Sequence, residues 1–160
     1  MKSERFEVTL VGTHGLLVPE TIAKSFLDKG HKRVKIEAHF EGKSISFHGA
    51  IQQWKGNYLV SFGKRYQKAL GVFPNDYFQL QFFEDTSKYG VDMPEELEAV
   101  LHSDPEAHKI FESFTAGKKR GIIYMILAYK TSQTRIDKSL LVCANLKRGI
   151  RNNPDLIKSF

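Results

Sequence analysis

The chain has 160 residues, of which 41% are hydrophobic and 26% charged, and its formal net charge is +6. This length and apolar content suffice for a substantial core, in one domain or in one domain with an appended layer. The single cysteine excludes an internal disulfide and any zinc site built on several cysteines, and it fits a reducing compartment.

The charge is unevenly distributed along the chain. The net charge is +5 over residues 1–83, −7 over residues 84–112 and +8 over residues 113–160. The acidic and basic blocks can neutralise each other across helix contacts, or the basic end can meet an anionic partner. No apolar run approaches the roughly 20 residues that span a bilayer, and the N-terminus lacks an apolar segment of signal-peptide length. We therefore expect a cytoplasmic protein with no membrane contact.

The first half of the chain predicts short strands. Residues 5–12 alternate between apolar and polar side chains, which is typical of a half-buried strand. Pro19 suits the start of a short helix over residues 20–27. Residues 33–40 and 44–52 alternate again on either side of a Gly-containing turn, and this pattern predicts a hairpin.

A charged helical turn follows after another short strand. Residues 64–70 form this turn, and Gly71 ends it in the left-handed conformation. Pro74-Asn75-Asp76 then leads the chain into a strand over residues 77–83. Because short strands with helical connections are usual in small barrels, we expect a closed antiparallel β-barrel of about six strands over residues 1–90.

The apolar period then changes from two to 3.6, which predicts a set of about four short helices over residues 91–150. The expected starts are Met93-Pro94-Glu95 and the N-caps Asp104, Thr115 and Ser132. Residues 151–160 are expected to be a fraying tail. The predicted fold is therefore α+β, with a helical module packed on the barrel.

The helical segment contains several short sequence motifs in a definite order. They are Tyr89-Gly90-Val91-Asp92-Met93-Pro94-Glu95-Glu96-Leu97, Asp104-Pro105-Glu106-Ala107, Phe111, Phe114-Thr115, Gly117-Lys118-Lys119-Arg120, Ala128-Tyr129-Lys130 and Thr134-Arg135, with Lys138 three residues further on. Together these motifs resemble those of the YdeI/OmpD-associated, or bacteriocin-protection-like, family. Residues 30–34 and 70–76 resemble the small barrel domain of unknown function that often precedes this module.

The resemblance implies a small closed barrel followed by helices, and it does not imply a catalysed reaction, because the family label describes a phenotype rather than a chemistry. Two positions depart from the family pattern. Asn75 stands where Gly is usual, but Asn tolerates the left-handed conformation. Lys138 replaces a more usual Arg, which weakens the expectation of bidentate anion recognition at that position.

Five basic residues are the candidate ligand-binding residues: Lys118, Lys119, Arg120, Lys130 and Arg135. The first three lie in the first turn of a predicted helix, where cations are unfavourable unless an anion is present. An exposed helix N-terminus flanked by cations can bind phosphate or carboxylate. In the alternative structural interpretation, these side chains pair with the acids of residues 92–112 or stabilise helix ends.

Other chemistry finds little support in the sequence. The six histidines form no HxH or HExxH motif and have no thiolate partner, so we expect no metal. Cys143 occupies an apolar helical position, which predicts an inert core thiol rather than a nucleophile. Neither a GxSxG motif nor a phosphate-binding loop is present, and we expect no catalytic residues and no cofactor.

We therefore expect a non-enzymatic binding module that recognises an anionic small molecule or protein partner. The alternative is nucleic-acid binding. Residues 70–76 also resemble the half-barrel unit of AbrB-like transcription regulators, and the sequence pI of about 9.4 permits phosphate contacts. Trp54 and Tyr66 are the aromatic residues that we expect to be exposed and able to stack on bases.

Overall fold

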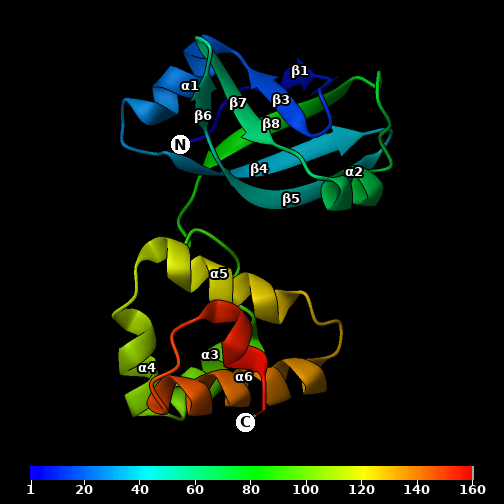
Figure 1. Cartoon of the computed structure of the whole chain (residues 1–160). Helices are drawn as coiled ribbons and strands as arrows, with labels where there is room; N and C mark the ends of the chain where they lie inside the picture. The colour runs from blue at the N-terminus through cyan, green and yellow to red at the C-terminus, as the bar shows by residue number, and fades with distance from the viewer. Residues whose placement is uncertain (160) are drawn as a thin grey trace. The chain divides into compact units, whose positions relative to one another are not determined.

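The computed structural model describes residues 1–159, which divide into two compact units (Figure 1). The N-terminal unit is Met1–Thr86, and the C-terminal unit begins at Ser87. Each unit has its own cluster of buried apolar side chains, and no residue belongs to both clusters. The chain thus builds two cores rather than one large one.

Eight strands form two four-stranded sheets in the N-terminal unit, and all their pairings are antiparallel. The first sheet has the order β1-β8-β4-β5 and the second the order β2-β3-β7-β6. The strands are β1 (Phe6–Val8), β2 (Leu10–Val11), β3 (Gly15–Val18), β4 (Arg33–Phe40), β5 (Lys43–Ala50), β6 (Gln52–Trp54), β7 (Asn57–Ser61) and β8 (Phe78–Glu84).

These sheets differ from the predicted closed barrel: no strand pairing within residues 1–159 joins them into one. Two runs of alternating residues each break into strands of different sheets. Residues 5–12 break at Thr9, whose hydroxyl donates to the carbonyl of Asp76 at 2.9 Å. Residues 44–52 break at Ile51. Alternation predicts which face of a strand is buried but not which sheet the strand joins, so the sequence did not reveal these breaks.

Large apolar side chains from both sheets fill the N-terminal core together with helices α1 (Glu20–Leu27) and α2 (Lys64–Leu70). The largest fully buried ones are Phe26, Phe62, Phe82, Leu16, Ile36, Leu70 and Leu80. Along β4 the predicted alternation holds, because Val34, Ile36 and Ala38 are all buried. The core therefore lies on the face of β4 that its sequence pattern indicates.

The connection from α2 to β8 has the predicted turn geometry. Gly71 has a φ of 82° and Asn75 a φ of 76°, so both are left-handed. The Asp76 carboxylate accepts a hydrogen bond from the backbone N–H of Phe73 at 2.8 Å and closes the turn. Asn75 therefore has the backbone conformation that Gly adopts readily and Asn tolerates.

Of the two aromatic residues predicted to be exposed, only one is. Trp54 is 58% exposed at the end of β6. Tyr66 instead stacks on Phe47 with 4.6 Å between ring centres, and it packs against the N-terminal core.

Helices form the C-terminal unit, and the four predicted ones are present (Figure 1). They are α3 (Glu95–His102), α4 (Pro105–Glu112), α5 (Ala116–Leu127) and α6 (Ser132–Lys147), followed by the 3-10 helix η1 (Asn153–Ile157). Asp104 and Thr115 are N-caps as predicted, but Thr131 rather than Ser132 caps α6 by accepting from the N–H of Thr134 at 3.2 Å. Among the described residues, no helix has the length and apolar character needed to cross a membrane.

The described part of the expected tail is packed rather than frayed. Leu156 of η1 is fully buried in the C-terminal core. The side-chain amide of Asn145, itself buried on α6, donates to the carbonyls of Leu156 and Lys158, both at 2.9 Å. The hydrogen bonds of this buried amide hold η1 in place. The sequence pattern of η1 itself does not predict a helix.

The only cysteine lies in the C-terminal core, as predicted. Cys143 is 2% exposed. Burial, with the nearby Asp104 carboxylate as a smaller cause, raises the pKa of its thiol to about 11. The thiol is therefore protonated at neutral pH, which makes it a poor nucleophile.

Candidate functional site

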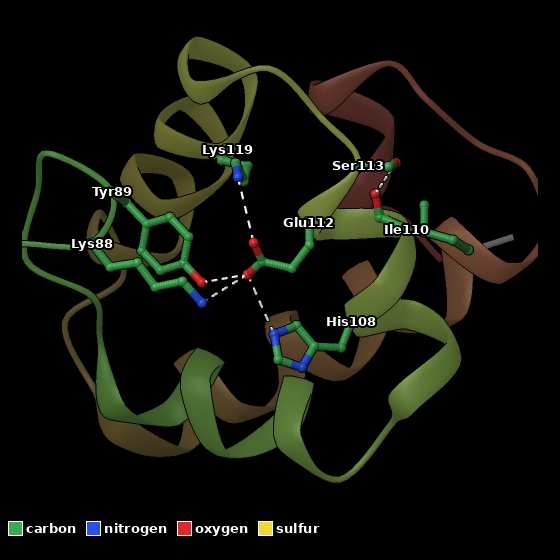
Figure 2. Close-up of polar contacts among 7 residues, drawn as sticks. All are labelled: Lys88, Tyr89, His108, Ile110, Glu112, Ser113 and Lys119. Carbon is green, nitrogen blue, oxygen red and sulfur yellow. Dashed lines mark hydrogen bonds and ion pairs between the residues drawn. The ribbon is translucent and has the colours of Figure 1, made fainter.

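A carboxylate with several donors stands out in the C-terminal unit (Figure 2). Oε1 of Glu112 accepts a hydrogen bond from the Tyr89 hydroxyl at 2.6 Å. The same oxygen lies 3.4 Å from Nζ of Lys88 and 3.4 Å from Nε2 of His108, and Oε2 lies 3.5 Å from Nζ of Lys119. We call these five residues the Glu112 cluster.

Three parts of the chain position the cluster. His108 and Glu112 are four residues apart on α4, so they share one face of that helix. Lys88 and Tyr89 lie in the segment before α3, and Lys119 lies in the first turn of α5. Local packing fixes the tyrosine between these parts: its ring makes an edge contact with Phe111 at 5.8 Å, and the Lys119 ammonium lies 5.6 Å from the ring centre.

The electrostatics of the cluster favour an ionised Glu112. Burial alone would raise the pKa of this carboxyl group, but the Tyr89 hydrogen bond and the charges of Lys88 and Lys119 outweigh it and lower the pKa to about 2. Burial and the hydrogen bond to this carboxylate raise the pKa of Tyr89. At neutral pH the pair is therefore a carboxylate and a neutral phenol.

A cavity of about 180 Å³ adjoins the cluster. Lys88, Tyr89 and His108 belong to both the cluster and the cavity wall. The other lining residues are Ser87, Val91, Asp92, Met93, Glu98, Leu101 and His102. The wall thus combines an ammonium group, two imidazoles and a phenol with two carboxylates and several apolar side chains.

The two histidines of the cavity lie close together without forming a metal site. The ring centres of His102 and His108 are 5.5 Å apart. Across the described residues, no group of three or more His, Cys, Asp or Glu side chains is arranged to hold a metal ion.

The five basic residues singled out in the sequence lie in different surroundings. Lys118 donates to the carbonyl of Arg151 and, at 3.0 Å, to the side-chain oxygen of Asn153. Its ammonium also lies 5.0 Å from the Phe114 ring centre. This lysine therefore ties the first turn of α5 to the segment around η1.

Of the other four basic residues, two have polar partners in the structure and two have no ion pair among the described residues. Lys119 belongs to the Glu112 cluster. Arg135 donates to the carbonyls of Tyr129 at 2.7 Å and Leu127 at 3.2 Å, so it caps the end of α5. Arg120 is half-buried and Lys130 is exposed, and neither has an ion pair within the part of the chain that the structure describes.

The five basic residues fall into two groups at opposite ends of α5, Lys118 to Arg120 in one and Lys130 with Arg135 in the other. One lies in the first turn of α5 and the other beyond its last turn. A helix rises about 1.5 Å per residue, so Lys119 and the carbonyl of Leu127 are separated by about 12 Å along the axis. Lys138, next to the second group, approaches the carbonyl of Ile157 at 3.4 Å and the Tyr129 ring at 5.6 Å instead.

Residues 90–149 match the family model for bacteriocin-protection, YdeI or OmpD-associated proteins, OmdA. The C-terminal unit contains an OmdA domain. The resemblance of the helical segment to this family is thereby confirmed over residues 90–149. His108, Glu112 and Lys119 lie inside the OmdA domain, and Lys88 and Tyr89 lie immediately before the matched segment. The resemblance of residues 30–34 and 70–76 to a small barrel domain stays a prediction.

Two further comparisons concern the whole chain. No curated protein matches it. The solution structure of PHS018 from Pyrococcus horikoshii is 17% identical to it, over an alignment that covers 50% of this chain and 88% of that one, with a TM-score of 0.41.

Proposed function

We propose that the OmdA domain of this chain is a binding module for a small ligand with an anionic group, held in the cavity beside Glu112. The observation in support is that Lys88, Tyr89 and His108 belong to both the cluster and the cavity wall. A small cavity that adjoins a carboxylate with a shifted pKa is the kind of place where ligands bind.

The charges around the cavity indicate the chemistry of the ligand. Counted with Asp92 and Glu98 of the cavity wall, two ammonium groups stand against three carboxylates, which favours a ligand that carries a cationic group as well as an anionic group, with the anionic group near Lys88. Asp92 and Glu98 line the same cavity, so an amino or hydroxyl group on the ligand would also find acceptors there. A volume of about 180 Å³ equals that of roughly six water molecules. A small amino acid or hydroxy acid fits these limits.

Lys88 is the cation that can turn towards a ligand. Its side chain is 68% exposed, whereas that of Lys119 is 17% exposed. Exposed lysines lose little when they exchange one partner for another. In this proposal Lys119 keeps Glu112 in place while Lys88 contacts the ligand, and Arg120 and Lys130 remain available to a larger anionic partner.

We propose binding rather than catalysis. With a pKa of about 2, Glu112 is a weak proton acceptor near neutral pH, since an efficient general base has a pKa near the working pH. Cys143 is buried and protonated, so it does not supply a nucleophile either.

The test is a titration of the whole protein with glycine, glycolate, lactate, serine and inorganic phosphate, followed by amide chemical shifts. We expect at least one of these acids to shift the amide signals of residues 87–93 and 98–108. Lys88→Gln should weaken that binding about three- to fivefold, the range of a partly exposed ion pair. Lys109→Gln removes the same charge from an exposed position on α4 outside the cavity wall, and it should bind like the unchanged protein. Equal loss in both variants, or shifts confined to other residues, would contradict this site.

Nucleic-acid binding by the N-terminal unit is a second candidate. A hollow of about 570 Å³ is lined in part by Arg5, Lys43 and Tyr77, and Glu7 and Glu41 belong to the same wall. Tyr77 is 63% exposed, and Phe73 on the same connection is 72% exposed. Cations beside open aromatic rings are the groups that hold single-stranded nucleic acid.

A mobility shift with a single-stranded oligonucleotide tests this candidate. Binding should weaken steeply as salt rises, because phosphate contacts release counterions. Tyr77→Ala should weaken it, while Tyr124→Ala, which removes an exposed tyrosine from α5, should not. Absence of retention at low salt would remove the candidate.

A further inference from the structure

Two histidines line the cavity beside Glu112, and they come from different helices. His102 lies in the last turn of α3, and His108 lies on α4. Their ring centres are 5.5 Å apart, with an angle of 46° between the ring planes. Nε2 of His108 lies 3.4 Å from Oε1 of Glu112, whereas His102 is exposed and makes no ion pair with any described residue. We call His102 and His108 the histidine pair.

The formal charges around the histidine pair are negative on balance. Two ammonium groups lie against three carboxylates: Lys88 and Lys119 against Asp92, Glu98 and Glu112. With neutral imidazoles these surroundings therefore carry a net charge of −1. Negative surroundings oppose the entry of an anionic group unless a further positive charge is supplied nearby.

The other titratable side chains near the pair do not supply that charge. The hydroxyl of Tyr89 stays neutral, because burial and its hydrogen bond to Glu112 raise its pKa. Asp104, the N-cap of α4, forms an ion pair of 2.7 Å with Lys147 of α6. This contact lowers the pKa of Asp104 and raises that of Lys147, so both stay charged and their charges cancel. The imidazoles remain, and histidine is the side chain that ordinarily changes its charge between roughly pH 5 and 8.

We propose that an anionic ligand enters the cavity together with a proton from solvent, which the histidine pair takes up. This inference rests on the proposed function of the cavity and adds its regulation by pH. One imidazolium brings the charge of the surroundings from −1 to zero. A second imidazolium would lie 5.5 Å from the first and be repelled by it, so the uptake is about one proton per ligand. The end of α3 favours a positive charge on His102, because a helix dipole is negative at its C-terminus.

The direction of the pH dependence follows from this linkage. An anion beside an imidazole favours the protonated form of the ring. By the same linkage, the protonated pair binds the anion more tightly than the neutral pair does. The affinity should therefore fall as the pH rises from about 6 to about 8, by at most about tenfold per pH unit for a single proton.

Glycolate and glycine separate this effect from binding as such, because they are of similar size and differ in charge. Glycolate carries an anionic group alone. Glycine also carries an ammonium group, for which Asp92 and Glu98 are acceptors in the cavity wall. Its own cation offsets the negative surroundings, so the proton linkage should be weaker for glycine than for glycolate.

Amide-shift titrations of the whole protein with each acid, at about pH 6, 7 and 8, test the proposal. The dissociation constant for glycolate should be about tenfold or more higher at pH 8 than at pH 6, and that for glycine should differ by about threefold or less. The histidine ring signals give a second readout when the pH is varied with and without glycolate. The titration midpoint of His102 or His108 should move to higher pH with glycolate, whereas that of His14, exposed in the N-terminal unit, should stay in place.

Two variants assign the proton to the pair, and each is checked for native amide dispersion. The double variant His102→Gln and His108→Gln should bind glycolate with nearly the same affinity at each pH. His102→Gln alone leaves the contact between His108 and Glu112 in place and should reduce the change between pH 6 and pH 8 to about threefold or less. His14→Gln is the control and should keep the pH dependence of the unchanged protein.

The outcomes separate this inference from the proposed function. Failure of glycolate to bind at pH 6, equal affinity at pH 6 and pH 8, an equal midpoint shift at His14, or full pH dependence in the double variant would each overturn the proton uptake. The proposed function would still stand in these cases if an acid shifted the amide signals of the cavity wall. Absence of binding by every acid at every pH would overturn both.

Discussion

Glu112 receives donors from three segments: the chain before α3, α4 itself and the first turn of α5. Each contact alone is ordinary, because the carboxylate is 32% exposed and surface ion pairs contribute little. The short Tyr89 bond differs, since a hydrogen bond to a charged group is stronger than one between neutral groups. The cluster therefore stabilises the C-terminal unit as well as forming one side of a cavity.

Glu112→Gln should make the C-terminal unit less stable and change how its stability depends on pH. The folded-state pKa of about 2 is lower than the ordinary value of 4.5, so the stabilisation is present above about pH 4.5 and is lost as the pH falls towards 2. Near pH 7 we expect a loss of about 1–2 kcal/mol. Urea unfolding at several pH values measures this.

The matched control is Glu106→Gln, an exposed glutamate on the same helix. It should leave the free energy of unfolding nearly unchanged at each pH. If the two variants lost stability in parallel from pH 7 to pH 2, the Glu112 contacts would not account for the effect.

Arg135 and Lys130 are both basic, but Arg135 hydrogen-bonds to backbone carbonyls whereas Lys130 is exposed. Arg135→Ala removes the donors to the carbonyls of Leu127 and Tyr129, and it should cost about 1–2 kcal/mol of unfolding free energy. Lys130→Ala removes an exposed side chain without an ion pair in the described chain and should change it by about 0.5 kcal/mol or less. Thermal unfolding of both variants makes the comparison, and equal losses would contradict the assigned cap.

At the level of elements, the sequence pattern predicted the strands and helices whose formation depends on neighbouring residues. The alternating residues 33–40 correspond to β4, and apolar spacing with capping residues located α3 to α6. Partners distant in sequence were missed. The break at Thr9 involves a carbonyl 67 residues away, and the order of η1 depends on the amide of Asn145. Neither partner changes the local pattern.

The candidate site was missed for the same reason. The acids of residues 92–112 have the spacing of solvent-facing side chains, and Glu112 does lie near the surface. What sets it apart is the approach of Lys88, Tyr89 and Lys119 from other segments. The spacing of four residues between His108 and Glu112 was the one local signal of this cluster.

Asn145 should decide whether η1 stays packed on α6. Asn145→Ala removes an amide that donates to the carbonyls of Leu156 and Lys158 and leaves those carbonyls without it. We expect a loss of about 2–3 kcal/mol and faster amide exchange in residues 153–158. Asn152→Ala, at an exposed position without a side-chain cap, is the control and should exchange like the unchanged protein. Unchanged exchange in Asn145→Ala would contradict this role.

At the level of the whole molecule, the two separate cores predict two folding units. Residues 1–86 contain one complete apolar cluster, and the chain from residue 87 contains the other. Each fragment should therefore show a cooperative thermal transition and dispersed amide signals when produced alone. Chains this short are of marginal stability, so transitions at lower temperature than in the full chain are compatible with this prediction. An unfolded fragment at all temperatures would refute it.

The burial of Cys143 has a practical consequence for measuring motion. As the only thiol, with a pKa of about 11, it reacts with an alkylating reagent only when α6 separates from the rest of the C-terminal core. The rate of that reaction, divided by the rate for an unfolded chain, gives the population of opened molecules without any engineered label. Because the cavity beside Glu112 belongs to the same unit, a ligand that enters it should slow the alkylation in proportion to its occupancy.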